Sequence, residues 1–162
     1  MKKNTRNNEI FKLDHYTRNL FVLFDQTRDT LINAIELEFK RSKTNFAQSK
    51  ILYMLSQQKK GMTITNISKW LLRNLNSVST LINKMEKEGL VKKTKNKEDG
   101  KAYIKITQKG SELWNQVNER AIFLTFSALS EDEKEQFKVL LKKLRAKARG
   151  ILGLDFKPPF LP

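Results

Sequence analysis

Polar and basic side chains recur at helical spacing between residues 76 and 87, on one side of a segment whose other side is apolar. The apolar side follows the 3, 4, 7 spacing of one helix face, with Val78, Leu81, Ile82 and Met85. At 100° per residue, the opposite side holds Asn76, Thr80, Asn83 and Lys87, with Lys84 beside them. Amide, hydroxyl and ammonium groups bond base edges and phosphates, so this face suits the major groove of DNA.

Several residues of this face can bond bases, and some also have a purely structural alternative. Asn76 and Asn83 can pair bidentately with adenine. Lys84 or Lys87 can bond guanine, and each such pair gives about 1–3 kcal/mol of discrimination. Asn76 can instead cap its own helix, because asparagine is favoured there. The short side chains of Ser77, Ser79 and Thr80 can contact a phosphate or a thymine methyl group. Ser79 can instead bond the backbone of its own helix.

Phosphate contacts are expected on both sides of this helix. Arg73, just before it, can reach a phosphate or pair with an acidic neighbour, and backbone amides near Thr63 and Asn74 can bind phosphate. Further lysines follow the helix: Lys92, Lys93, Lys95, Lys97 and Lys105. Alternate residues of a strand face opposite sides, so some of these lysines only contact water, and Lys95 and Lys97 are the first candidates.

Helical periodicity predicts the elements that must hold this face. Apolar residues at helical spacing run through residues 13–39 without a Pro or Gly, which predicts a long first helix. A shorter helix follows Asn45, and Thr63 can cap a third. Gly89 supplies the stop of the polar-faced helix. The expected order is therefore helix, helix, and a helix-turn-helix pair.

After Gly89 the apolar period changes to two. Residues 90–107 alternate around Glu98-Asp99-Gly100, a turn signal, which predicts a β-hairpin. One long helix is predicted from about residue 107 to 126, and the capping pattern of Ser130 and Glu133 opens a last helix. The predicted fold class is mainly α with a small β-wing.

Positive charge is concentrated on the same segment. The 162 residues carry a formal charge of +15, and residues 46–111 hold +10 of it, from 14 basic and 4 acidic side chains. Residues 1–45 carry +3 and residues 112–162 carry +2. This distribution is expected of a surface that faces a polyanion. The alternative is a generally lysine-rich protein, since Lys outnumbers Arg by 24 to 8.

Several other chemistries lack the residues that they need. The chain has no Cys, which excludes disulfides, thiolate metal sites and thiol redox sensing. His15 is the sole histidine, so zinc would need an all-carboxylate ligand set, and no metal, cofactor or catalytic site is predicted. No apolar run is long enough to span a membrane, and no signal peptide follows the basic start. We therefore expect a cytoplasmic protein without a membrane partner.

Short sequence blocks in a specific order link the predicted helices to the hairpin. They are Val78-Ser79, residues 81–91, Asp99 and residues 107–110. Over about residues 60–111 this order resembles the MarR family of bacterial winged-helix regulators. Where the family has Asp-Arg-Arg in the wing, this chain has Asp99-Gly100-Lys101. The resemblance implies that Asp99 orients the basic side chain of Lys101 for the minor groove.

The resemblance also implies a homodimer and a single domain over residues 1–162. Residues 8–45 and 112–162 would supply the N- and C-terminal dimerisation helices, and residues 46–111 the winged helix-turn-helix lobe that binds double-stranded DNA. The amphipathic helices support a dimer independently, because they offer more apolar faces than one small core needs. Two lobes about one DNA turn apart, roughly 34 Å, imply a pseudo-palindromic operator.

A small aromatic or amphipathic effector is a further implication of the resemblance, bound between the dimerisation helices and the winged lobe. The candidates by residue type are Tyr16, Phe24, Tyr53, Trp70 and Trp114. Aromatic residues at helical spacing more often belong to a core, and that alternative stays open. The apolar residues 151–162 are predicted to dock without forming a helix, on this chain or on a partner.

These patterns together predict a sequence-specific transcriptional regulator that is nucleoid-associated when bound to DNA. A repressor is favoured over an activator, because an occluding dimer needs no further surface. The alternative is a non-specific architectural DNA-binding protein, since the polar face contains no Arg. Footprinting distinguishes the two, because architectural coating does not protect a compact palindrome.

Overall fold

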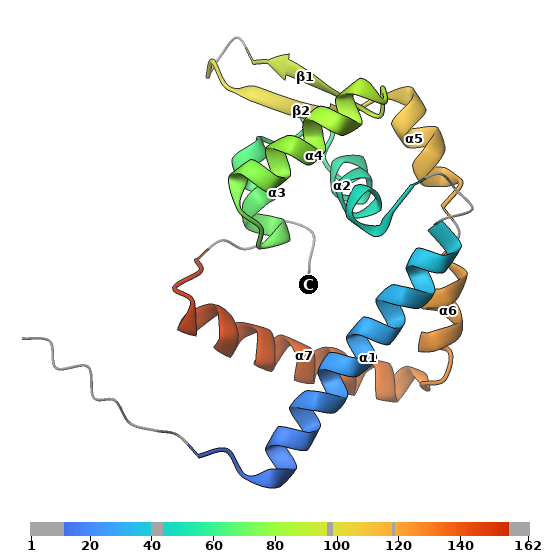
Figure 1. The fold of residues 1–162 in the computed structure, drawn as a ribbon, viewed down its shortest axis with the longest axis vertical. Coiled ribbons are helices and arrows are strands. Elements are labelled where there is room, and N and C mark those ends of the chain that lie inside the picture. Colours follow the sequence, from blue (N-terminus) through green and yellow to red (C-terminus); the bar gives the residue numbers. More distant parts are fainter. Residues whose placement is uncertain (1–11, 40–43, 97–98, 118, 156–162) are drawn as a thin grey trace, which may run out of the picture.

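The computed structural model describes residues 12–39, 44–96, 99–117 and 119–155 of the chain. Within them, helices surround one antiparallel hairpin (Figure 1). The elements are α1 (His15–Phe39), α2 (Phe46–Ser56), α3 (Ile64–Leu71), α4 (Leu75–Lys87), β1 (Val91–Lys95), β2 (Ala102–Ile106), α5 (Gln108–Asn115), α6 (Arg120–Phe126) and α7 (Glu131–Ile151). The predicted class, mainly α with a small β-wing, is confirmed.

Polar side chains define where five of these helices begin. Each cap accepts the backbone N–H three residues further on; the caps are Asn45, Thr63, Asn74, Thr107 and Ser130. The predicted cap at Thr63 and the capping box of Ser130 with Glu133 are confirmed. The alternative that Asn76 caps α4 is wrong, because Asn74 occupies that position.

The single long helix predicted from about residue 107 to 126 is wrong. Helix α5 ends at Asn115, where the N–H of Gln116 bonds carbonyls of the last turn, and α6 starts only at Arg120. Asparagines at positions 115 and 118 favour helix ends over helix interiors. In addition, Glu38 of α1 accepts the N–H of Ala121 at 3.0 Å, so a residue distant in sequence caps the new helix.

The main core lies within the winged lobe, which we define as α2 to α5 with the hairpin. Helix α2 contributes four fully buried side chains, and the others come from α3, α4 and the segments around the hairpin. The cluster is Ile51, Leu52, Met54, Leu55, Met62, Ile67, Val78, Ile82, Met85, Leu90, Val91 and Ile104. Figure 1 shows α4 and the hairpin on the outer side of this lobe, away from α1 and α7.

The predicted hairpin is confirmed. Strands β1 and β2 pair antiparallel, with Val91 opposite Ile106 and Lys95 opposite Ala102. Met62, just before α3, exchanges two backbone hydrogen bonds with Ile104 and so attaches the helix-turn-helix to the free side of β2. This second pairing has no signal in the sequence, because it involves a single residue.

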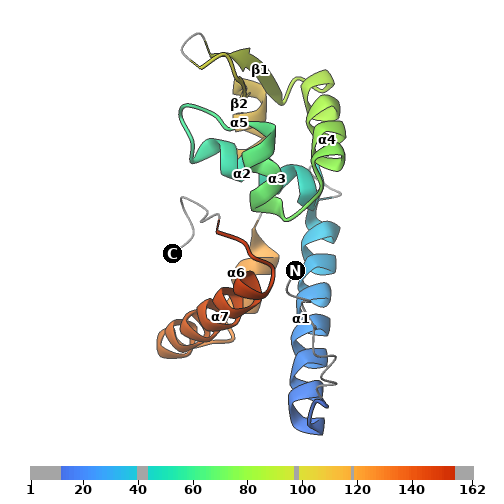
Figure 2. The ribbon, with the colours of Figure 1, turned by 90° about the vertical axis from the view of Figure 1, so that its left-hand side faces the viewer.

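Helices α1, α6 and α7 lie on the other side of the molecule (Figures 1 and 2). Of α1, only Ile35 and Phe39 are buried, and neither α6 nor α7 contains a buried residue. The first half of the predicted apolar stripe of α1 is therefore uncovered in this chain. The prediction that residues 151–162 contain no helix is wrong at Ile151, which is the last residue of α7, and both Ile151 and Leu152 are exposed. Residues 156–162 lie outside the described residues.

Gly110 and Gly150 provide a matched test of the packing between the hairpin and α5. A Cβ atom at Gly110 would overlap the carbonyl oxygen of Leu90, whereas a Cβ at Gly150 in α7 would meet nothing within 4 Å. We expect Gly110→Ala to lower the free energy of unfolding by about 3 kcal/mol or more. Gly150→Ala should raise it by about 0.5–1 kcal/mol, because alanine favours a helix interior. Urea denaturation measures both, and equal effects would contradict the packing described.

Candidate nucleic-acid interface

The outer face of α4 is exposed because its inner face is buried. Val78, Ile82 and Met85 are at most 1% accessible and lie in the core. A helix that buries these positions must turn the opposite side outward. The predicted base-contacting side chains are accordingly exposed: Asn76, Thr80, Asn83, Lys84 and Lys87. Ser77 is also exposed, whereas Ser79 is only half-buried at the side of the helix.

The turn that leads into α4 is held by short polar contacts. The Oδ1 atom of Asn74 accepts the N–H of Ser77 at 2.8 Å, so this side chain acts as a cap rather than as a free base-contacting group. The hydroxyl of Ser68 donates to the carbonyl of Arg73, and Leu72 adopts a left-handed conformation with φ 52°. Arg73 is exposed. Burial, and then the charges of Arg28 and Arg73, lower the pKa of Lys50 in α2.

The first strand of the hairpin is bonded to the outer face of α4. Lys93 Nζ lies 2.8 Å from a carboxylate oxygen of Glu86 and 2.6 Å from the amide oxygen of Asn83. The hydrogen bond from the Lys93 side chain, then the bond from its backbone N–H and its charge, lower the pKa of Glu86. The oxygen of Asn83 keeps a second lone pair for adenine, and the charge of Lys93 offsets that of Glu86. The sequence predicted that Lys93 binds phosphate. No spacing in the sequence indicated its ion pair with Glu86.

Other lysines lie towards the end of α4 and beside the hairpin. Lys84 Nζ lies 3.9 Å from a carboxylate oxygen of Glu88, and Lys87 is exposed at the last residue of α4. Lys95 lines a surface cavity of about 660 Å³ beside the hairpin, with Lys60 and Lys105 among the other lining residues. Lys60 was not among the predicted contacts. Lys97 lies outside the described residues.

The wing tip is organised by Asp99. One carboxylate oxygen accepts the backbone N–H of Lys101 at 3.1 Å, and the other accepts the hydroxyl of Tyr103 at 2.9 Å. The N–H of Lys101, the Tyr103 hydroxyl and the Lys101 charge lower the pKa of Asp99, while the bond to Asp99 raises the pKa of Tyr103. Asp99 therefore fixes the backbone that carries the exposed Lys101 side chain. Sequence analysis missed Tyr103, although it lies four residues after Asp99 across a turn.

The predicted aromatic candidates do not lie in one place. Tyr53 and Trp114 contact each other, with ring centroids 5.6 Å apart, and Trp70 and Trp114 pack against the main core. Phe24 lines a groove of about 540 Å³ between α1, α6 and α7. Tyr16 is exposed near the start of α1. Only two of the five side chains are thus shown in direct contact.

Two other kinds of site were also sought in the described residues. No group of three or more His, Cys, Asp or Glu side chains there is placed to hold a metal ion. None of the described helices combines the length and apolar character needed to cross a membrane. Neither finding supplies a functional site, so the surface formed by α4 and the hairpin is the candidate that the geometry offers.

Two sequence comparisons agree with this arrangement. Residues 45–103 match the sequence profile of the MarR family. Over 113 residues the chain is 33% identical to the uncharacterized HTH-type transcriptional regulator YkoM of Bacillus subtilis (strain 168), which covers 67% of this chain and 71% of that protein. The chain belongs to the MarR family. The resemblance deduced from the motifs is confirmed.

Two solved structures have the same architecture. The S. aureus MepR–DNA complex superposes with a TM-score of 0.69 at 26% identity, over 78% of this chain and 94% of that chain. The organohalide-sensing transcriptional regulator RdhR, bound to 2,4-dichlorophenol, superposes with a TM-score of 0.71 at 22% identity, over 91% and 89%. The second likeness concerns the fold alone. This MarR-family chain is thus a transcriptional regulator by family, with α4 and the hairpin in the place of the winged helix.

The wing tip of this MarR-family chain allows charge and geometry to be separated. Lys101→Ala should weaken DNA binding and reduce the slope of log K against log salt by about one, because one positive charge at the DNA is lost. Tyr103→Phe should weaken binding about 2- to 10-fold, the equivalent of one hydrogen bond, with the slope unchanged. Fluorescence anisotropy at several salt concentrations measures both quantities. Lys147→Ala, which removes one exposed charge of α7, is the control, and an unchanged slope in Lys101→Ala would remove that lysine from the interface.

Proposed function

We propose that this chain is a sequence-specific repressor that binds double-stranded DNA as a homodimer, at the nucleoid in the cytoplasm. The observation that carries the proposal is the exposed polar face of α4, which is flanked by a lysine-bearing hairpin and lies opposite the buried Val78, Ile82 and Met85. Such a helix fits the major groove, and the hairpin reaches phosphates beside it. Repression follows from occlusion, which needs no further surface.

Base contacts are assigned to side chains along the outer face of α4. Asn76 and Asn83 are the adenine-binding candidates, and Lys84 and Lys87 bond guanine or phosphate. Short hydroxyl groups at Ser77, Ser79 and Thr80 contact the backbone or a thymine methyl group. Phosphate contacts come from Arg73, the backbone amides that follow Asn74, Lys95 and Lys97, with Lys101 held by Asp99 for the minor groove. The winged lobe of residues 46–111 is the DNA-binding part.

Uncovered apolar side chains support the homodimer. On α1, α6 and α7 the described protomer exposes a set of large hydrophobic residues that includes Tyr16, Leu20, Phe21, Leu23, Phe24, Phe123, Leu124, Phe137, Leu140 and Leu144. A large number of exposed apolar side chains on several helices favours an association site, because their exposure to water is unfavourable. A second copy of the chain supplies the same apolar helices, so residues 8–45 and 112–162 form the dimer.

We also propose that the chain binds a small aromatic effector. RdhR binds 2,4-dichlorophenol, and its fold is shared. Within this chain the aromatic candidates are Tyr53, Trp70 and Trp114 beside the core, and Phe24 and Tyr16 on α1. Binding between the dimerisation helices and the winged lobe would change the angle of α4 to the DNA. A tryptophan fluorescence titration with chlorinated phenols tests this class of ligand.

The specificity of DNA binding separates a regulator from an architectural protein. We expect the purified chain to bind its own upstream intergenic DNA about 10³-fold more tightly than an unrelated duplex of equal length, at roughly 150 mM salt. Footprinting should protect one compact pseudo-palindrome. Equal affinity for both duplexes, without a discrete footprint, would support the architectural alternative.

The dimer is tested by placing a charge on the uncovered face of α7. Leu144 is 62% exposed in the protomer, and Leu144→Glu should convert the dimer to a monomer at about 10 μM protein, because a buried carboxylate is costly. Sedimentation velocity measures the mass. Ala146→Glu introduces the same side chain about 200° around the helix and should leave the dimer intact. A dimeric Leu144→Glu variant would contradict this interface.

A further inference from the structure

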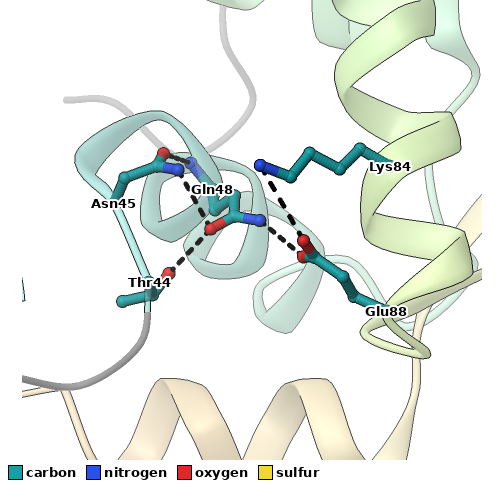
Figure 3. Close-up of polar contacts among 5 residues, drawn as sticks. All are labelled: Thr44, Asn45, Gln48, Lys84 and Glu88. Atoms are coloured by element: carbon teal, nitrogen blue, oxygen red, sulfur yellow. Dashed lines mark hydrogen bonds and ion pairs between the residues drawn. The ribbon is translucent and has the colours of Figure 1, made fainter. Parts of the chain in front are cut away.

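We propose that Gln48 of α2 and Glu88 at the end of α4 form a positioning pair that sets the recognition helix for specific DNA binding. Gln48 Nε2 donates to Glu88 Oε2 at 2.7 Å, across 40 residues of sequence (Figure 3). Glu88 is the C-cap residue of α4, one residue after Lys87. Neither residue belongs to the surface assigned to DNA. The proposal rests on the proposed DNA-binding function and adds two residues that act through α4.

The orientation of the Gln48 amide is fixed by its neighbours. Its oxygen accepts from Asn45 Nδ2 at 3.1 Å and from the Thr44 hydroxyl at 3.4 Å (Figure 3). Two donors on that side require the oxygen there, so the NH₂ group must point towards Glu88. Gln48 is only 3% exposed, and its own N–H is held by the Asn45 cap at 3.0 Å. A buried amide satisfied on both sides has one favourable position.

The carboxylate of Glu88 is thereby drawn towards α2. Its other oxygen lies 3.9 Å from Lys84 Nζ, so one carboxylate contacts both the buried amide and a lysine of the DNA-facing side. An unrestrained glutamate at this end of α4 would repel phosphate. The hydrogen bond with Gln48 holds this carboxylate towards α2, and the side chain of Lys84 stays 63% exposed beside it. Glu86 is restrained in the same sense by Lys93.

The same end of α2 is also bonded to α1. Glu36 of α1 accepts the N–H of Phe46 at 3.1 Å, in the first turn of α2. A continuous set of polar contacts therefore runs from α1 through the start of α2 to the end of α4. Because α1 carries the proposed dimer surface, the pair fixes α4 relative to the dimer. Its loss should lower the preference for a specific site more than the affinity for any DNA.

A charge exchange tests the pair. Gln48→Glu places two carboxylates together, whereas the double variant Gln48→Glu with Glu88→Gln restores one donor and one acceptor, and Asn45 and Thr44 can still donate to the new carboxylate. At about pH 8, chosen to keep the introduced carboxylate ionised, we expect the single variant to lose at least about tenfold in the ratio of specific to unrelated DNA affinity. The double variant should recover to within about threefold of the original chain.

Gln108→Glu is the matched control. Gln108 Nε2 donates to Glu112 at 2.9 Å on α5, so this change creates the same pair of carboxylates and the same net charge without breaking the contact of Gln48 with Glu88. It should leave the specificity ratio unchanged. A specificity ratio unchanged in Gln48→Glu, or lowered equally in Gln108→Glu, would overturn the positioning role.

Hydrogen exchange tests, without DNA, whether the contact of Gln48 with Glu88 anchors the end of α4. The amides of Glu88, Gly89 and Leu90 bond carbonyls of the last turn of α4. They should exchange faster in Gln48→Glu and recover in the double variant, and unchanged exchange would refute the anchoring. If the original chain shows no preference for its upstream DNA, the proposed function fails, while exchange still tests the anchor. If Gln48→Glu does not fold, the double variant is compared with the original chain. A difference between the two in hydrogen exchange or in the specificity ratio would overturn the proposal.

Discussion

The burial of one face of α4 is the constraint on which the candidate interface depends. Val78, Ile82 and Met85 fill the core that α2, α3 and the hairpin also share, so α4 cannot rotate about its axis without exposing them. Rotation by one residue position, about 100°, would bury polar groups in an apolar core. The set of side chains presented to solvent is therefore a consequence of the core. The same core places the hairpin beside the C-terminal half of α4.

Polar contacts then determine how the acidic residues at the end of α4 are used. Glu86 accepts a hydrogen bond from Lys93, and Glu88 accepts one from Gln48. Both carboxylates are therefore bonded to other side chains of this protein. Thr107 bonds the carbonyls of Gly89 and Leu90 and caps α5, which joins the end of the hairpin to the end of α4. A surface for a polyanion is thus built around acidic side chains that the protein itself neutralises or holds inward.

Two glutamates of α1 connect the winged lobe to the other helices. Glu36 bonds the N-terminus of α2, and Glu38 bonds that of α6, so one end of α1 contacts both parts of the molecule. Carboxylates at helix N-termini are favourable because they meet unpaired N–H groups. The orientation of the winged lobe relative to the apolar surfaces of α1, α6 and α7 depends on these contacts as well as on Ile35 and Phe39.

Local chemistry was enough for the sequence by itself to determine most of the elements and the face of α4. Helical period, the caps at Thr63 and Ser130 and the turn at Asp99 act within a few residues, so the chain alone encodes them. Only the tertiary structure decided the break between α5 and α6, the pairing of Lys93 with Glu86 and the contact of Gln48 with Glu88. Contacts such as Gln48 with Glu88, or Glu38 with Ala121, join residues 40 and 83 positions apart. Their distances follow from how the helices pack, which a periodic pattern along one segment does not specify.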